Sequence, residues 1–425
     1  MERKIEKFLK KWKDDSMKKP LILFGSKQIG KTFSVLDFGK KEYKNMIYFN
    51  TDNNKEIINL FTKEKSTEKL ILNLSLISGE TILKEDTLVI LDNLTNNEIA
   101  KGLKIFGSEH SKYNIIAITS RKEKINEFKA EELQFKSMNE MDFEEFLWAH
   151  DEKNLANLIK ESFNKRKTCA FHKVALDLFQ EYLVSGGLPE VVKASIAGAT
   201  EYELDAIKQK IIDVYKKEVA LNNILIDIPR GIEVIDSLPE QLKKENKKFQ
   251  YGVIGSGKRA KEYESSINYL VNNQLVYRSY KAKDIKGVLS SCKDLDSFKL
   301  YVIDEGLLYT MLHLNYKQFA SNENIKEILY ENHIAKTLSD NGFGLYYYQS
   351  EGKAEVNFVV QNRMGQIIPI ELTTKSNSKA KSLSVFMKKF TVKEGYRITE
   401  NNFQTKKDIR YIPVYATFCI DNFTV

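Results

Sequence analysis

Lysine and threonine close the octapeptide at residues 25–32, which reads Gly-Ser-Lys-Gln-Ile-Gly-Lys-Thr. The two glycines allow backbone N–H groups to curl round a phosphate, and Lys31 can reach the β and γ phosphates of a nucleotide. The hydroxyl of Thr32 can bind Mg²⁺. The pattern therefore predicts a phosphate-binding loop, in which we expect these residues to contact ATP: Gly25, Ser26, Lys27, Gln28, Ile29, Gly30, Lys31, Thr32 and Phe33.

A strand must lead into such a loop and a helix must follow it. Residues 22–24 are apolar and suit a buried strand, and residues 33–38 continue with helical spacing. Three further apolar runs, at 47–50, 88–92 and 115–119, are typical of strands buried on both faces. Since helical patterns separate them, we expect a parallel sheet with crossover helices and with ligands at the carboxyl ends of its strands.

Asp92 ends one of these strands and is placed to hold the water shell of Mg²⁺. A turn aspartate is the alternative. The next residue is Asn93, where hydrolytic proteins of this architecture usually carry a glutamate that polarises the attacking water. Because an amide cannot accept a proton, and general-base catalysis contributes ~10²–10⁴-fold, we expect ATP binding with slow hydrolysis.

Two more residues are candidates at the end of the following strand. Thr119 could contact the γ-phosphate, although hydroxyls at this position are more often helix caps. Arg121 lies near enough in the sequence to be considered as a stabiliser of negative charge. Asp92, Asn93, Thr119 and Arg121 thus form the predicted catalytic set.

The composition sets broad limits on the class of protein. The chain has 425 residues, which favours several domains, and 66 Lys+Arg against 58 Asp+Glu give a net charge of +8. An acidic partner such as DNA fits this balance, and so does a solvated lysine-rich surface. Three cysteines without CxxC spacing indicate neither a disulfide framework nor a zinc site, and no apolar run has the length of a membrane span. We expect a cytoplasmic protein.

Changes of pattern along the chain divide it into four segments. Residues 1–141 form the P-loop core, residues 142–244 have the helical periodicity of a lid, and residues 245–290 suit a winged-helix module. Residues 291–425 form a last α/β domain with alternating strands.

Seven stretches together resemble the bacterial and archaeal AAA-type ATP-binding proteins whose ATPase domain precedes a C-terminal domain of unknown function. They occur in the same order as in that family: 25–32, 88–94, 115–120, 141–146, 186–190, 299–307 and 330–332. The resemblance covers nearly the whole chain and implies a fold similar to signal-transduction ATPases. It also implies that Pro189, in the Gly-Leu-Pro turn of the lid, lies against the adenine. A turn that merely ends a helix is the alternative.

The C-terminal domain of such proteins is similar to restriction-endonuclease-like folds, whose metal site needs grouped carboxylates and a lysine. The resemblance matches Glu331 to the helix glutamate of that site, but Asn357 replaces an aspartate and Thr373 replaces the lysine after Glu371. Glu355 and Lys375 could compensate for these changes. Otherwise the site has decayed into a degenerate nuclease site formed by Glu331, Glu355, Asn357, Glu371 and Thr373.

Basic residues gather in the segment assigned to the winged helix: Lys247, Lys248, Lys258, Arg259 and Lys261. They could meet a phosphodiester backbone, or they could be a solvated charge run.

Three functions therefore stay open. The first is an ATP-binding switch with weak ATPase activity, associated with nucleic acid; the second is an ATP-gated metal-dependent nuclease. The third is a non-catalytic DNA-binding protein stabilised by ATP. A protein partner and a homo-oligomer also remain compatible with the sequence.

Overall fold

The computed structural model describes residues 1–108, 112–121, 131–221, 228–350, 355–374 and 382–422. Within these ranges the chain forms two compact units. The first contains Met1–Glu140 together with Asn272–Gln274, and the second contains Met141–Val271 and Leu275–Val425. No helix in the described ranges is both long enough and apolar enough to cross a bilayer.

The first unit contains a sheet of five strands in the order β2-β3-β4-β1-β5, all parallel. The parallel sheet predicted from the sequence is confirmed. The elements of this unit are α1 (Lys4–Asp14), β1 (Leu21–Phe24), α2 (Lys31–Glu42), β2 (Asn45–Asn50), α3 (Lys55–Lys63), α4 (Thr67–Ser78), β3 (Thr87–Asp92), α5 (Asn97–Ser108), β4 (Asn114–Thr119) and β5 (Gln134–Ser137).

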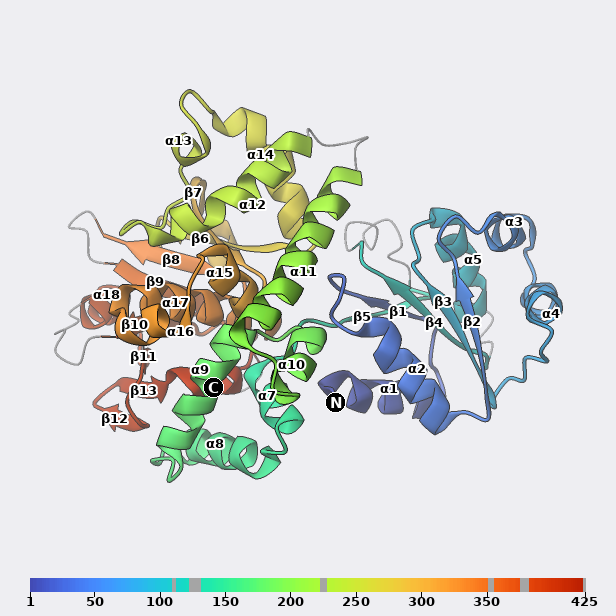
Figure 1. Cartoon of the computed structure of the whole chain (residues 1–425), viewed down its shortest axis with the longest axis horizontal. Helices are drawn as coiled ribbons and strands as arrows, with labels where there is room; N and C mark the ends of the chain where they lie inside the picture. The colour runs from blue at the N-terminus through green and yellow to red at the C-terminus, as the bar shows by residue number, and fades with distance from the viewer. Residues whose placement is uncertain (109–111, 122–130, 222–227, 351–354, 375–381, 423–425) are drawn as a thin grey trace. The chain divides into compact units, whose positions relative to one another are not determined.

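Helices cover both faces of this sheet. The helices α1 and α2 lie on one face, and α3, α4 and α5 lie on the other (Figure 1). Every residue of β3 and β4 is buried, as expected for central strands between two helical layers. Alternate strand residues such as Ile22, Val89 and Ala117 belong to the core that α3, α4 and α5 complete. The central strands β1, β3 and β4 thus present their carboxyl ends at one edge of a rigid sheet.

The second unit begins with a helical region. Its helices are α7 (Phe143–Ala149), α8 (Lys153–Lys165), α9 (His172–Ser185), α10 (Pro189–Ile196), α11 (Glu201–Leu221), α12 (Ile228–Lys243), α13 (Tyr251–Ile254) and α14 (Ala260–Asn272). Asp142 caps α7, because its side chain accepts from the N–H of Glu145 and the Glu145 side chain reaches back in return.

An eight-stranded mixed sheet follows, in the order β12-β13-β11-β10-β9-β8-β6-β7. Its strands and helices are β6 (Val276–Ala282), η1 (Leu289–Ser291), β7 (Lys293–Val302), α15 (Glu305–Met311), α16 (Tyr316–Ser321), α17 (Glu323–Asp340), β8 (Tyr346–Gln349), β9 (Glu355–Gln361), β10 (Ile367–Thr373), α18 (Ser382–Phe390), β11 (Gly395–Thr399), β12 (Gln404–Lys406), β13 (Ile409–Pro413) and η2 (Val414–Cys419).

The winged-helix module is not confirmed. The strand of the predicted segment 245–290, β6, belongs to the eight-stranded sheet, where it pairs with β7 and, in parallel, with β8. The boundary predicted between residues 290 and 291 therefore lies between β6 and β7, which are paired neighbours in one sheet. That boundary, like the division of the second unit into lid, module and C-terminal domain, stays a prediction.

Candidate nucleotide-binding site

The phosphate loop lies between β1 and α2, as the sequence predicts. Gly30 is the N-cap of α2 and has a φ of 88°, a left-handed conformation that glycine adopts without strain. A Cβ at Gly25 would overlap the carbonyl oxygen of Met138, so only glycine fits there. Both glycines of the motif are thus required by the backbone itself.

Lys31 is buried, and its ammonium lies over the loop. Its Nζ donates to the carbonyl oxygens of Gly25 at 2.8 Å and Ser26 at 2.6 Å. The side chain therefore folds back along the loop, where backbone N–H groups and the ammonium can together receive an anion. Of the remaining loop residues, Ile29 is buried, Lys27 is half-buried, and Gln28 and Phe33 are exposed.

Thr32 and Asp92 meet at the carboxyl edge of the sheet. The Thr32 hydroxyl donates to Oδ2 of Asp92 at 2.8 Å, and Asp92 is only 4% exposed. The same oxygen accepts the Tyr48 hydroxyl at 2.9 Å, and Oδ1 accepts the N–H of Asn93 at 2.8 Å. A hydroxyl hydrogen-bonded to a strand-end carboxylate is the oxygen pair that holds Mg²⁺ in P-loop nucleotide sites.

Asn93 sits beside this pair on the exposed edge. Its φ is 59°, in the left-handed region that asparagine tolerates better than most residues. Its Nδ2 donates to Oδ1 of Asn50 at 3.2 Å, and both side chains are exposed. The side chains of Asn93 and Asn50 therefore place two amides where a general base would be needed.

The structure places the other predicted catalytic residues at the end of β4. Thr119 is buried, and its hydroxyl accepts the N–H of Arg121 at 3.1 Å. The guanidinium of Arg121 is half-buried and makes no hydrogen bond or ion pair with the part of the chain that the structure describes. Their catalytic roles stay predictions.

Three residues around the loop escaped the sequence analysis. Arg3 donates to the carbonyl oxygens of Ile29 at 2.8 Å and Asn139 at 2.7 Å. The Ser26 hydroxyl donates to Oε1 of Glu140 at 3.1 Å. Arg3 and Glu140 belong to no motif, so nothing in the sequence singles them out. Tyr48 lies on β2, two residues before the position opposite Asp92, so finding it requires the order of the strands in the sheet.

Pro189 lies in the second unit, as the first residue of α10. The turn before it is held on both sides. The N–H of Gly187 donates to Oδ2 of Asp304 at 2.6 Å, and its carbonyl accepts the N–H of Met141 at 2.7 Å. Burial and the adjacent Glu305 raise the pKa of Asp304 to about 6. The turn is therefore fixed to residues at the start of α7 and at the N-cap of α15.

The predicted nuclease residues lie on α17, β9 and β10, with Glu331 at their centre. Glu331 is 1% exposed and receives Lys247 at 2.7 Å, Lys299 at 3.2 Å and the Tyr301 hydroxyl at 2.7 Å. Asn357 adds a fourth donor, through Nδ2, at 3.2 Å. Burial alone would raise the pKa of Glu331, but the two ammonium groups hold it well below its usual range.

The other carboxylates of this group are also paired with cations. Glu355 accepts Lys299 at 2.5 Å, and Glu371 accepts two N–H groups of Arg397 at 3.0 and 2.8 Å. Thr373 is half-buried at the end of β10, and Lys375 lies outside the described residues. Within the described ranges, no group of three or more His, Cys, Asp or Glu residues is arranged to hold a metal ion.

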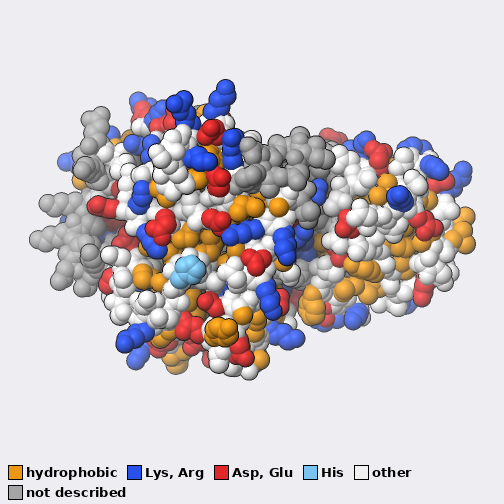
Figure 2. All heavy atoms as spheres, turned by 45° about the horizontal axis from the view of Figure 1, so that its top comes forward, with side chains coloured by type: hydrophobic (Ala, Val, Ile, Leu, Met, Phe, Trp, Pro, Cys, Tyr) orange, Lys and Arg blue, Asp and Glu red, His pale blue; other side chains and the backbone are white. Residues whose placement is uncertain are grey.

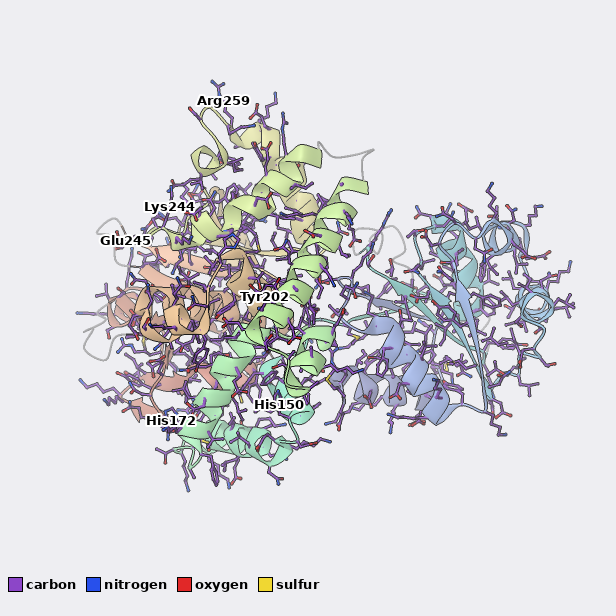
Figure 3. All side chains as sticks on the ribbon, in the orientation of Figure 1. His150, His172, Tyr202, Lys244, Glu245 and Arg259 are labelled. Atoms are coloured by element: carbon purple, nitrogen blue, oxygen red, sulfur yellow. The ribbon has the colours of Figure 1, made fainter. Side chains whose placement is uncertain are left out.

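Lys247 has a different role from the one considered for it. Its place in the basic segment predicts contact with a phosphodiester backbone or with solvent, but it is only 6% exposed and is bound to Glu331. Lys258, Arg259 and Lys261 are exposed, and Figure 3 shows Arg259 on the turn before α14.

Comparisons with known proteins support the reading of the first unit. Residues 17–147 match the AAA domain family, so the chain contains an ATPase-type P-loop domain, a class that binds nucleotide, typically with Mg²⁺. Residues 176–318 match one domain of unknown function (DUF8612), and residues 326–417 match another (DUF4143). The DUF4143 match does not confirm a restriction-endonuclease-like fold.

Among solved structures, the chain is similar to a Signal Transduction ATPase with Numerous Domains (STAND) protein with a tetratricopeptide repeat sensor from Pyrococcus horikoshii. The two are 12% identical with a TM-score of 0.24, and the match covers 80% of this chain and 45% of that chain. This chain therefore spans less than half the length of that protein. The comparison with curated proteins finds no match.

Proposed function

We propose that this protein is an ATP-binding switch in which Lys31, Thr32 and Asp92 hold Mg-ATP. The observation that carries the proposal is the 2.8 Å hydrogen bond between the Thr32 hydroxyl and Asp92. It brings the hydroxyl that would bind Mg²⁺ and the carboxylate that would hold its waters to one point beside the loop. Lys31, folded over the loop carbonyls, supplies the positive charge for the β and γ phosphates.

Calorimetric titration of ATP into wild type and Lys31→Ala tests this proposal. Loss of one charge-assisted contact to phosphate should weaken binding about 100-fold, which corresponds to about 2.7 kcal/mol. Lys40→Ala, an exposed lysine of the same helix, is the matched control and should bind as wild type does. Equal affinity in wild type and Lys31→Ala would contradict the proposal.

Hydrolysis should be slow, because Asn93 and Asn50 offer amides where a proton acceptor is needed. Asn93→Glu should raise steady-state ATP turnover by up to ~10²-fold. Asn93→Gln has the same length without the carboxylate and should leave turnover at the wild-type level. Rapid turnover in wild type, or equal turnover in the two variants, would show that Asn93 does not limit the reaction.

The switch is proposed to act through the turn before Pro189. In the first unit, Ser26 of the loop contacts Glu140, the last residue before Met141. In the second unit, Met141 is hydrogen-bonded to Gly187, and Gly187 is bound to Asp304. The peptide bond between Glu140 and Met141 thus joins a residue that contacts the phosphate loop to a residue that is hydrogen-bonded to the turn. We expect a movement of the loop to affect α15 through these few contacts.

Hydrogen exchange with and without Mg-ATP measures this coupling. We expect altered protection of the Gly187 amide and of the first turn of α15, because both depend on the Asp304 carboxylate. Lys31→Ala should abolish the response. Unchanged exchange in wild type saturated with ATP would leave the protein a nucleotide binder without a switch.

We further propose an association with nucleic acid through the exposed turn that carries Lys258 and Arg259 and the first turn of α14, which carries Lys261. Basic and acidic side chains are interspersed on the face drawn in Figure 2, so binding would rely on this local group and weaken steeply with salt. Reversal of these charges to glutamate should abolish DNA binding at low salt. Lys153→Glu, at an exposed site on α8, serves as the control.

The C-terminal carboxylates are proposed to be a degenerate, non-catalytic nuclease site. Glu331, Glu355 and Glu371 are each bound to a lysine or arginine. Incubation with DNA or RNA and Mg²⁺ or Mn²⁺, with and without ATP, should produce no cleavage. Cleavage that disappears in Glu371→Ala would favour the ATP-gated nuclease instead.

A further inference from the structure

Tyr48 contacts the nucleotide site from the neighbouring strand. It lies on β2, which pairs in parallel with β3 so that Asn50 stands opposite Asp92. Its hydroxyl donates to Oδ2 of Asp92 at 2.9 Å, and 42% of the residue is exposed. Tyr48, two residues before the end of its strand, thus points its hydroxyl toward the carboxylate and is not part of the core.

The Asp92 carboxylate is fixed by three neutral donors. Oδ2 accepts the hydroxyls of Thr32 and Tyr48, and Oδ1 accepts the N–H of Asn93. A carboxylate offers about four acceptor positions, so one position remains for a further donor. Among the described residues, no lysine or arginine forms an ion pair with Asp92, so no basic side chain would have to be displaced by a cation.

We propose that Tyr48 is a positioning residue of the nucleotide site, whose hydroxyl orients the Asp92 carboxylate toward the hydration shell of Mg²⁺. The inference rests on the proposed function. Outer-shell partners of this kind act by fixing the rotation of a ligating or water-holding group, and their loss typically weakens metal affinity ~10–100-fold.

The chemistry of the hydroxyl suits this role. A phenol is uncharged near neutral pH, so the Tyr48 hydroxyl has a proton to donate to the Asp92 carboxylate, in the hydrogen bond of 2.9 Å. Phenylalanine would keep the ring and remove only the donor.

Tyr48→Phe, titrated with ATP in Mg²⁺ and again in EDTA, tests the inference. The dissociation constant should rise about 10-fold in Mg²⁺ and stay unchanged in EDTA, because the hydroxyl acts only through the metal. Tyr43→Phe is the matched control. The Tyr43 hydroxyl is in the same unit and has no hydrogen-bond partner among the described residues, so this variant should match wild type in both arms.

The outcomes separate the two proposals. If wild type binds no ATP in either arm, the proposed function is wrong and the role of Tyr48 falls with it. If wild type binds normally and Tyr48→Phe is indifferent or tighter in Mg²⁺, only the role of Tyr48 is overturned. Equal weakening in both arms would also overturn it, since Tyr48 would then touch the nucleotide itself.

Discussion

Two buried carboxylates, Asp92 in the first unit and Glu331 in the second, differ in the charge of their hydrogen-bond donors. Asp92 is 4% exposed and Glu331 is 1% exposed. From the described residues, Asp92 accepts two hydroxyls and one backbone N–H. Glu331 accepts two ammonium groups in addition to a phenol and an amide.

The difference shows that burial and residue type do not decide whether an acidic side chain can serve a metal ion. A carboxylate with neutral donors still carries the negative charge that a divalent cation needs. A carboxylate already neutralised by lysines gains little from Mg²⁺ and would have to release buried ammonium groups first. Nuclease chemistry is disfavoured at Glu331 for this reason, and nucleotide-linked Mg²⁺ is favoured at Asp92.

Glu331→Gln should give the largest effect on stability. The substitution leaves the buried Lys299 with Glu355 and the buried Lys247 with the more distant Glu327, at 3.5 Å, and breaking a buried pair costs about 3–5 kcal/mol. Urea unfolding of the second unit measures the loss. Glu327→Gln is the control, because Glu327 contacts Lys247 from an exposed position and should cost less than about 0.5 kcal/mol. Equal stability of the two variants would break the comparison.

Acid should act through the same carboxylate. The pKa of Glu331 is lowered in the folded protein, so its contribution to stability is present above its unfolded pKa of about 4.3. That contribution is lost as the pH falls through this value toward the folded pKa. Urea midpoints between pH 7 and pH 3.5 should therefore fall more steeply for wild type than for Glu331→Gln. Parallel curves would mean that the lysines do not stabilise the ionised form.

Asp92→Asn should change function more than stability. Removal of the charge should weaken ATP binding in Mg²⁺ by ~10–100-fold, or about 1.4–2.7 kcal/mol, and spare binding in EDTA. The cost in the free energy of unfolding should be about 1 kcal/mol, since an amide can still accept the Thr32 and Tyr48 hydroxyls. A loss of stability as large as that of Glu331→Gln would contradict the assignment of Asp92 as a metal-linked residue.

Arg397→Lys should give the smallest effect. Arg397 uses Nε and Nη2 to grip one oxygen of Glu371, a geometry that lysine cannot reproduce. The charge is kept, so we expect a loss of only about 1 kcal/mol in urea unfolding. A loss above about 3 kcal/mol would place Glu371, rather than Glu331, at the centre of the buried charge group.

The sequence was sufficient to predict the parts of the first unit that depend on local spacing. Gly30, Lys31 and Thr32 are consecutive, and Asp92 is the last residue of a strand whose continuous apolar run is typical of a buried parallel sheet. Their convergence follows from the rule that parallel strands end at the same edge. Tyr48 was missed because its role depends on which strand lies beside β3.

The charge group around Glu331 could not have been predicted in the same way. Residues 328–338 of α17 are all buried although they include Glu331, Asn332, His333 and Lys336. An amphipathic pattern assigns such residues to a solvated face. Their burial depends on partners as distant in sequence as Lys247, which only the folded chain brings together.

The backbone contact between the Gly187 turn and α15 has a mechanical consequence. A Cβ at Gly306 would overlap the carbonyl oxygen of Ser185, and one at Gly186 would overlap the Asp304 carboxylate. The two segments meet through backbone atoms at Gly306 and through the buried Asp304 side chain at Gly186, and neither glycine leaves room for a side chain of its own. We expect alanine at Gly306 to push α15 and the turn apart, because its methyl group would lie 2.4 Å from the Ser185 carbonyl oxygen, a distance at which one of the two segments must move.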